Sequence, residues 1–240
     1  MGRSRQSAIL AAWLATWLVA WLAVGPLPAF AVEGPLEQRR ASWPQWRLPA
    51  PLARPGRSDL EYPAWFAGDW QVSTWEAGTS AEGAVRWTVR FRPGPNGTVV
   101  GDRAANARAV GRALLGDALE EVRDDPANPN RQLARLKGEQ ILESTVIGRR
   151  SEQAVGEPSR FLSDELSLQI VHGPGDPRVS RIETLSRYVH HETGSDHWIE
   201  AEQWQASYPS PAQGLRVAAS STSHWQLRLD PLPPGSDRAS

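Results

Sequence analysis

The sequence contains no cysteine and only one lysine, Lys137. Without cysteine the chain can form no disulfide bond, so the fold must be held by burial of apolar surface, which a domain of this length can supply. Common catalytic motifs are also missing, since there is no G-x-S-x-G, no H-E-x-x-H, no P-loop and no Rossmann glycine pattern. We therefore name no catalytic residue, predict no cofactor and no metal ligand, and favour a role other than catalysis.

An excess of charge of one sign is absent too. The chain has 26 basic and 27 acidic residues, a formal net charge of −1. A basic surface that would attract nucleic acid or an anionic membrane is therefore not expected. We predict no nucleic-acid partner, and we expect a monomer.

The first 31 residues have the pattern of a secretory signal peptide. Two arginines precede a 17-residue apolar run, residues 8–24, which is shorter than the roughly 20 residues that a spanning helix needs. Two prolines follow, together with the small residues Ala29 and Ala31 in the A-x-A pattern of a cleavage site. We predict cleavage after Ala31 and export of the chain, with an uncleaved membrane anchor as the alternative.

The leader, residues 32–58, is rich in proline and arginine and shows no sustained period of 2 or 3.6. Such a composition predicts an extended tethering segment. The leader contains Trp43 and Trp46, which we expect to fold back onto the domain surface. A short motif for binding a partner is the alternative.

From residue 68 onward the dominant hydrophobic period is 2. In residues 84–92, apolar side chains alternate with arginine and threonine, which predicts a half-buried antiparallel strand. In residues 69–75 the same alternation sends Trp70 and Trp75 to opposite faces. Similar segments, separated by turns rich in glycine and proline, continue toward the end of the chain. We predict about eight or nine strands joined as a meander.

One segment has helical spacing instead. Residues 104–122 place Ala107, Val110 and Leu114 on one side of a helix. Pro126 then prevents further helix. We predict one α-helix over about 104–122, inserted between strands.

Eight or more sequential antiparallel strands most simply remove their two edges by closing into a barrel. The strands predicted at residues 178–188 and 197–204 have no wholly apolar face. A half-polar inner wall favours a ligand cavity over a dry core. The predicted fold class is all-β, mainly antiparallel: a single lipocalin-like β-barrel over residues 59–230, followed by a disordered tail, 231–240.

The start of the first strand resembles the Gly-x-Trp signature of lipocalins and the wider calycin group. Gly68, Asp69 and Trp70 stand there, with Trp65 and Phe66 just before them. In that group the tryptophan plugs the closed end of an eight-stranded barrel, so the resemblance implies this role for Trp70. The chain departs from the lipocalin pattern because a helix follows the third strand and the long carboxy-terminal helix is absent.

A second resemblance covers nearly the whole predicted mature chain. It rests on the segments YPAWFAGDWQV, VVGDRAANARA, DDPANPNRQ, SDELSLQI, RIETLSRY and IEAEQWQ. These are similar to segments of an uncharacterised protein family of cyanobacteria and plastids, whose members are exported or lie in the thylakoid lumen. That family has no agreed activity, so the resemblance implies compartment and fold and leaves mechanism open.

Two polar clusters of the later strands have both a structural and a functional interpretation. His190, His191 and His197 flank a predicted hairpin turn, and we favour solvated side chains over a zinc or copper site, which needs three or four convergent ligands. Glu200 and Glu202 fall on one strand face, about 7 Å apart along the strand. They could act as acid and base or pair with arginines of neighbouring strands.

Arg103 and Asn106 share one face of the predicted helix at i and i+3. An aspartate and an arginine at a helix start usually form a cap and an ion pair, but a face that closes one end of a barrel could hold a ligand headgroup. The loop 124–130 offers oxygen ligands for calcium without the spacing of an EF-hand loop, so we favour a rigid turn there.

We predict that the chain binds a small apolar or amphipathic molecule in the thylakoid lumen or periplasm. Two alternatives are kept: an assembly factor for a photosynthetic membrane complex, with the leader as a recognition arm, and an enzyme acting on a lipid or pigment. The predicted ligand-binding residues, four tryptophans that line or plug the cavity and four polar side chains, are Trp70, Trp87, Arg103, Asn106, Trp198, Glu200, Glu202 and Trp204.

Overall fold

The computed structural model describes residues 34–154, residue 157 and residues 159–233. The predicted signal peptide and residues 234–240 of the predicted tail lie outside this part of the chain. The helices and strands in chain order are α2 (Pro35–Ala41), β1 (Glu61–Tyr62), η1 (Ala64–Phe66), β2 (Gly68–Glu76), β3 (Val85–Pro93), η2 (Pro95–Gly97), β4 (Val99–Gly101), α3 (Arg103–Leu115), η3 (Gly116–Ala118), β5 (Leu119–Asp125), β6 (Asn128–Leu136), β7 (Gln140–Gln153), β8 (Arg160–His172), β9 (Arg178–Thr193), β10 (Asp196–Tyr208), η4 (Pro211–Gln213) and β11 (Ser221–Pro231).

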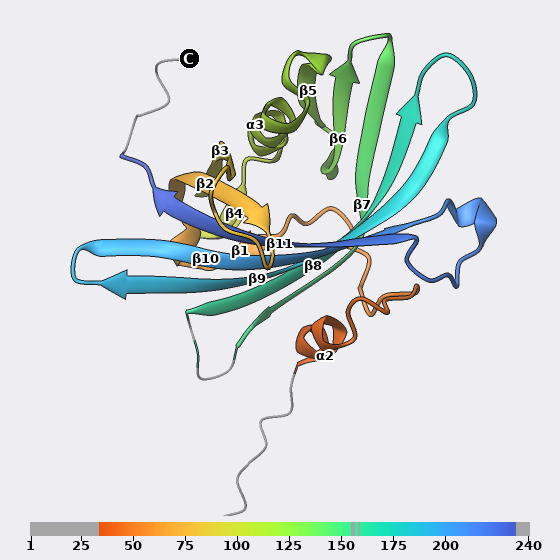
Figure 1. Cartoon of the computed structure of the whole chain (residues 1–240). Helices are drawn as coiled ribbons and strands as arrows, with labels where there is room; N and C mark the ends of the chain where they lie inside the picture. Colours follow the sequence, from red (N-terminus) through yellow and green to blue (C-terminus); the bar gives the residue numbers. More distant parts are fainter. Residues whose placement is uncertain (1–33, 155–156, 158, 234–240) are drawn as a thin grey trace, which may run out of the picture. The chain divides into compact units, whose positions relative to one another are not determined.

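The strands of the described residues form one antiparallel sheet of eleven strands, in the order β1-β4-β3-β2-β11-β10-β9-β8-β7-β6-β5. Strands adjacent in sequence pair with one another from β2 to β4 and from β5 to β11, and the last strand β11 returns to pair with β2. A closed up-and-down barrel would also need β4 to pair with β5. The other edge of β4 carries β1 instead, and helix α3 packs against both β3 and β5 (Figure 1).

The prediction of a mainly antiparallel β fold is confirmed. The prediction of eight or nine strands is wrong, because the sheet has eleven, and its two edge strands, β1 and β5, do not pair with each other. The sheet is nevertheless strongly curled. Tyr62 in β1 lies against Phe161 in β8, with ring centroids 5.7 Å apart, although the two strands are far apart in the strand order.

The inner face of the sheet is the concave side that holds an aromatic core. Phe66 lies at the centre of this core, with its ring centroid 4.9 Å from that of Phe91 and 5.0 Å from that of Tyr188. The buried residues of the inner cluster are Leu60, Phe66, Trp70, Val72, Phe91, Val99, Phe161, Ile199, Ala201 and Leu229. They come from strands as far apart in the sheet order as β4 and β8, so this cluster holds the curl together.

The outer face of the sheet is partly covered by the leader. Its buried cluster consists of Leu36, Trp46, Leu48, Leu162, Leu185, Trp204, Ala206 and Tyr208, of which the first three belong to the leader. Backbone hydrogen bonds fix the leader in place, since Leu48 N donates to Val217 O at 2.8 Å and Arg149 N donates to Ala53 O at 2.7 Å.

The predicted extended tether is therefore replaced by helix α2 and a segment packed into the core. Trp46 is 1% exposed, and the ring of Trp43 lies 5.5 Å from that of His224. Both tryptophans thus fold back onto the domain. Local periodicity could not show this, because the leader buries its apolar side chains one at a time along an irregular path.

Helix α3 is shorter than predicted. It ends at Leu115, where Gly116 follows with φ 54°, a conformation that favours glycine. Leu119 and Val122 have helical spacing, yet they belong to β5, where a register shift between Leu119 and Glu121 places both side chains in the core. A β-bulge thus gave these residues the spacing of a helix. Among the described residues no helix is long and apolar enough to cross a membrane.

Candidate ligand-binding groove

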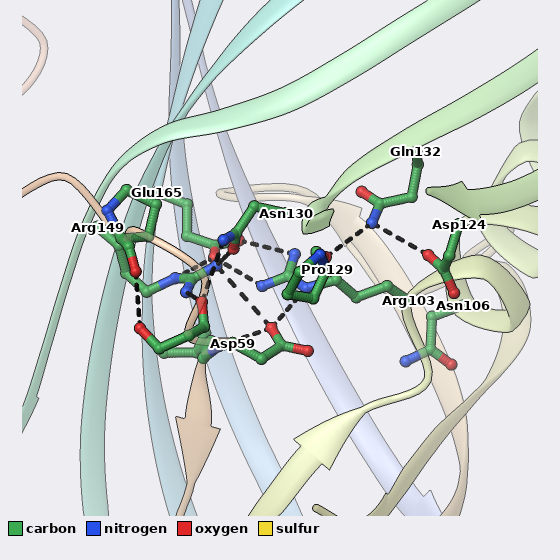
Figure 2. Close-up of polar contacts among 12 residues, drawn as sticks. Asp59, Arg103, Asn106, Asp124, Pro129, Asn130, Gln132, Arg149 and Glu165 are labelled. Carbon is green, nitrogen blue, oxygen red and sulfur yellow. Dashed lines mark hydrogen bonds and ion pairs between the residues drawn. The ribbon is translucent and has the colours of Figure 1, made fainter. Parts of the chain in front are cut away.

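Arg103, the predicted polar anchor, lies in a network of paired charges on the inner side of the sheet (Figure 2). Its Nε donates to Asp59 Oδ1 at 2.6 Å and a terminal nitrogen donates to Glu165 Oε1 at 2.9 Å. Arg149 donates to the same Glu165 oxygen at 2.6 Å and to Asn130 Oδ1 at 2.6 Å. Although burial raises the pKa of Glu165, the two arginines outweigh it and lower that pKa below its usual value.

This network joins three separate parts of the chain. Asp59 belongs to the segment before β1, Arg103 begins helix α3, and Glu165 lies in β8. Asn130 adds strand β6, since its Nδ2 donates to the carbonyl oxygens of Gly56 and Ser58 at 3.2 and 3.1 Å. The Arg103 side chain therefore acts as a structural tie between elements, and its Nε and both terminal nitrogens are already occupied.

Asn106 is also engaged with the protein itself. Its Oδ1 accepts from Arg90 N at 2.7 Å, and its Nδ2 donates to Arg90 O at 3.0 Å. Strand β4 pairs with β3 only from Phe91 onward. The amide of Asn106 thus continues that pairing by one residue, together with Asp102 N, which donates to Arg90 O at 2.9 Å.

Trp70 and Trp87 belong to the inner face. Trp70 is 2% exposed, and its indole Nε1 donates to Phe66 O at 2.8 Å. Trp87 packs against the same inner cluster. Trp70 is therefore buried within the inner cluster, and the Phe66 carbonyl holds its indole group in place.

The other four predicted residues, Trp198, Glu200, Glu202 and Trp204, share one face of β10, as alternation predicts. That face is the outer one, because Trp204 belongs to the outer cluster. The prediction that all four tryptophans line one cavity is wrong. Trp70 and Trp87 lie on the opposite side of the sheet from Trp198 and Trp204.

A groove of about 420 Å³ lies on this outer face. It crosses four adjacent strands, β9, β10, β11 and β2. Its lining residues are Trp75, Arg187, Val189, Glu200, Ala201, Glu202, Gln226, Leu227 and Arg228. The groove therefore contains Glu200 and Glu202 from the predicted set, and it adds Trp75 and two arginines that were not predicted.

Charged side chains in the groove lie close to polar or charged side chains of neighbouring strands. Arg187 donates to Glu202 Oε2 at 3.3 Å, and His224 Nε2 lies 3.6 Å from Glu202 Oε1. His191 Nε2 lies 3.1 Å from Glu200 Oε2. Basic and acidic side chains thus lie side by side in the lining of the groove, so hydrogen-bond donors and acceptors are close together.

Trp75 supplies the aromatic surface of the groove. Its partner across the strands is Gln226, which in turn faces Glu202. The indole Nε1 of Trp75 donates to Gln226 Oε1 at 2.9 Å. Within the described chain no aromatic ring or guanidinium stacks on Trp75, whereas Trp198 has His191 on its ring at 5.0 Å and Arg228 at 5.1 Å.

The described residues contain no group of three or more histidine, cysteine, aspartate or glutamate side chains placed to hold a metal ion. His190 and His197 lie with ring centroids 6.1 Å apart, and burial lowers the pKa of His190. His191 instead stacks on Trp198 on the other face.

In the β5–β6 turn, Asp125 accepts from Ala127 N at 2.8 Å and from Arg131 at 3.1 Å. These contacts hold the turn in one conformation.

The fold and the groove define a curled antiparallel β-sheet domain with a site of mixed polarity on its outer face. A family model described as "Domain of unknown function (DUF6816)" matches residues 54–229. The chain therefore belongs to this family, in agreement with the resemblance to an uncharacterised family. The match includes the whole groove and begins after helix α2. No curated protein and no solved structure matched the chain.

Proposed function

We propose that this protein binds a small amphipathic molecule in the outer groove, and that it does so without changing the molecule chemically. The observation that supports this most directly is the position of Trp75, whose ring lines a groove of about 420 Å³ beside two arginines and two glutamates. An aromatic surface next to a few convergent polar groups is typical of small-molecule sites, and this volume lies in their usual range.

The compartment belongs to the same proposal. The N-terminal sequence has the pattern of an export signal, and the sequence resembles an exported or thylakoid lumenal family of cyanobacteria and plastids. The Gly-x-Trp start adds a likeness to lipocalins, which bind small molecules. We propose a place in the thylakoid lumen or periplasm, with the outer groove in the role that a barrel interior has in lipocalins.

One observation favours an enzyme as the second candidate. Glu200 and Glu202 line the same groove, and each has a histidine Nε2 within 3.6 Å. A carboxylate beside a histidine is a common acid–base arrangement. An enzyme acting on a bound lipid or pigment would use these two pairs.

The leader could serve as the recognition arm of an assembly factor only after Trp46 had left the outer cluster.

The proposal is tested by native mass spectrometry of the full chain purified from an exporting photosynthetic host. We expect a bound molecule of a few hundred daltons that is lost on denaturation and is absent from the Trp75→Leu variant. The matched control is Trp225→Leu, since Trp225 is also half-buried but lies outside the groove. A bound molecule retained by the Trp75 variant would contradict the site, and a chain that carries no molecule in any preparation would contradict the function.

A further inference from the structure

The charges that line the outer groove cancel one another. Arg187 and Arg228 are its basic lining residues, and Glu200 and Glu202 are its acidic ones. Arg187 is paired with Glu202 at 3.3 Å, and Arg228 is paired with Asp230 at 2.8 Å. An anionic ligand group would meet the two glutamates, and a cationic group would meet the two arginines. A ligand charge of either sign would therefore meet like charges as well as opposite ones in the groove.

The pair formed by Arg187 and Glu202 remains accessible from the groove. The two side chains are 31% and 33% exposed. The guanidinium has five N–H donors and no acceptor, whereas the carboxylate has only acceptors. A hydroxyl group is both a donor and an acceptor. One ligand hydroxyl can therefore accept from Arg187 and donate to Glu202 at the same time, which neither an ammonium nor a carboxylate can do.

Beside this ion pair, Gln226 in β11 and Trp75 in β2 add a further hydrogen-bonding group and an aromatic surface to the groove. The indole N–H of Trp75 is bound to Gln226 Oε1, and this contact fixes the ring, while Gln226 keeps amide N–H groups that can donate. A fixed indole ring offers a flat apolar surface beside polar groups. Such a surface fits a ligand ring that has apolar C–H groups on its face and hydroxyls around its edge.

We infer that the outer groove binds the uncharged, polyhydroxylated headgroup of an amphipathic molecule, chemically a saccharide. This inference rests on the proposed binding function and adds the class of the headgroup. Free saccharides and saccharides attached to an apolar tail share this chemistry.

The test compares three probes that have alkyl tails of nearly equal length and different heads. These are octyl β-glucopyranoside, sodium octanoate and octyltrimethylammonium bromide, each titrated into the full chain below its micelle concentration and followed by calorimetry at low and high salt. We expect the glucoside to bind at least about tenfold more tightly than either ionic probe. We also expect its affinity to stay constant as salt rises, because an uncharged head is not screened.

Free glucose separates the two sources of the headgroup. Binding of glucose with an affinity close to that of octyl glucoside identifies a saccharide site, whereas much weaker binding identifies a site for a glycosylated apolar molecule. Both results support the inference. If glucose and octyl glucoside fail to bind while octanoate or the ammonium probe binds, the headgroup class is wrong and the binding function stands. If no probe binds, the inference fails, and the mass-spectrometric test then decides the binding function.

Two variants locate the binding. Trp75→Leu should weaken the binding of octyl glucoside on the order of tenfold, through loss of the stacking surface, whereas Trp225→Leu should leave the affinity unchanged.

A third variant tests the headgroup preference. Glu202→Gln removes one negative charge and leaves Arg187 without its partner. This variant should bind octanoate more tightly than the natural protein does, and the gain should vanish at high salt. An unchanged affinity for octanoate at low salt would show that the paired charges do not set the headgroup preference.

Discussion

Asp164 and Glu165 are neighbours in β8, yet the environments of their carboxyl groups shift their pKa values in opposite directions. Asp164 lies on the outer face and is fully buried. There, burial and the nearby carboxylate of Glu183 raise its pKa well above the usual value. Glu165 lies on the inner side between Arg103 and Arg149, which lower its pKa in spite of burial. One strand thus contributes two opposite dependences of stability on pH.

The first prediction concerns Asp164, whose buried carboxyl group lies beside that of Glu183. A group whose pKa is raised by folding contributes its full stability below its unfolded pKa and loses it as pH rises through the folded pKa. Asp164→Asn stays neutral at every pH. We expect the variant to gain stability over the natural protein as pH rises from about 4, by about 1.4 kcal/mol per pH unit until the folded pKa is reached. Urea unfolding at a series of pH values measures this difference, and a constant difference would contradict it.

The second prediction concerns Glu165. A group whose pKa is lowered by folding contributes stability above its unfolded pKa and loses it as pH falls through the folded pKa. We expect Glu165→Gln to be less stable at neutral pH by about 3–5 kcal/mol, because Arg103 and Arg149 lose a shared partner. The difference from the natural protein should shrink below about pH 4. An equal difference at acid and neutral pH would show that the charge of Glu165 does not cause the loss.

The third prediction concerns the attachment of the leader. Arg39 donates to both carboxylate oxygens of Glu183 at 2.7 Å, and Glu183 is fully buried. Arg39→Gln leaves that carboxylate without its cation and should cost about 3–5 kcal/mol of unfolding free energy. Arg40→Gln in the same helix is the control. Its ion pair with Glu37 is more exposed, so the expected cost is at most about 1 kcal/mol. Similar costs for the two variants would rule out a special role for Arg39.

The fourth prediction concerns Trp46, which fills the outer cluster from the leader. Its indole Nε1 donates to Arg39 O at 2.7 Å, and the ring is 1% exposed. Trp46→Ala should reduce the unfolding free energy by about 3–5 kcal/mol, as for other buried aromatic residues. Trp43→Ala, at a half-buried position, should cost clearly less. Equal stability of the Trp46 variant and the natural protein would mean that the leader is not part of the core.

Alternation along strands predicted the local part of the fold well. It placed Trp198, Glu200, Glu202 and Trp204 on one face, and it separated Trp75 from Trp70. Which face is concave depends on the curl of the whole sheet, and a single strand does not encode this. The cavity was therefore predicted inside the sheet, although the groove lies outside it.

The position of the groove depended on pairing that the sequence does not reveal. Trp75 meets Gln226 because the first long strand pairs with the last one, across about 150 residues of chain. The hydrogen-bond partners of Arg103 and Asn106 could not be predicted for the same reason. Their partners Glu165 and Arg90 lie in other strands, so their spacing on a helix could not distinguish a structural tie from a ligand anchor.

We propose that the ligand binds at Trp75 on the outer face and not at Trp70 and Trp87 inside the curl. The most direct measurement is ¹⁹F NMR of the chain labelled with 5-fluorotryptophan, with resonances assigned by single Trp→Phe variants and titrated with the tightest-binding octyl probe. We expect the Trp75 resonance to shift with the binding curve, while those of Trp70 and Trp87 stay in place. Shifts of Trp70 and Trp87 with an unchanged Trp75 would contradict it.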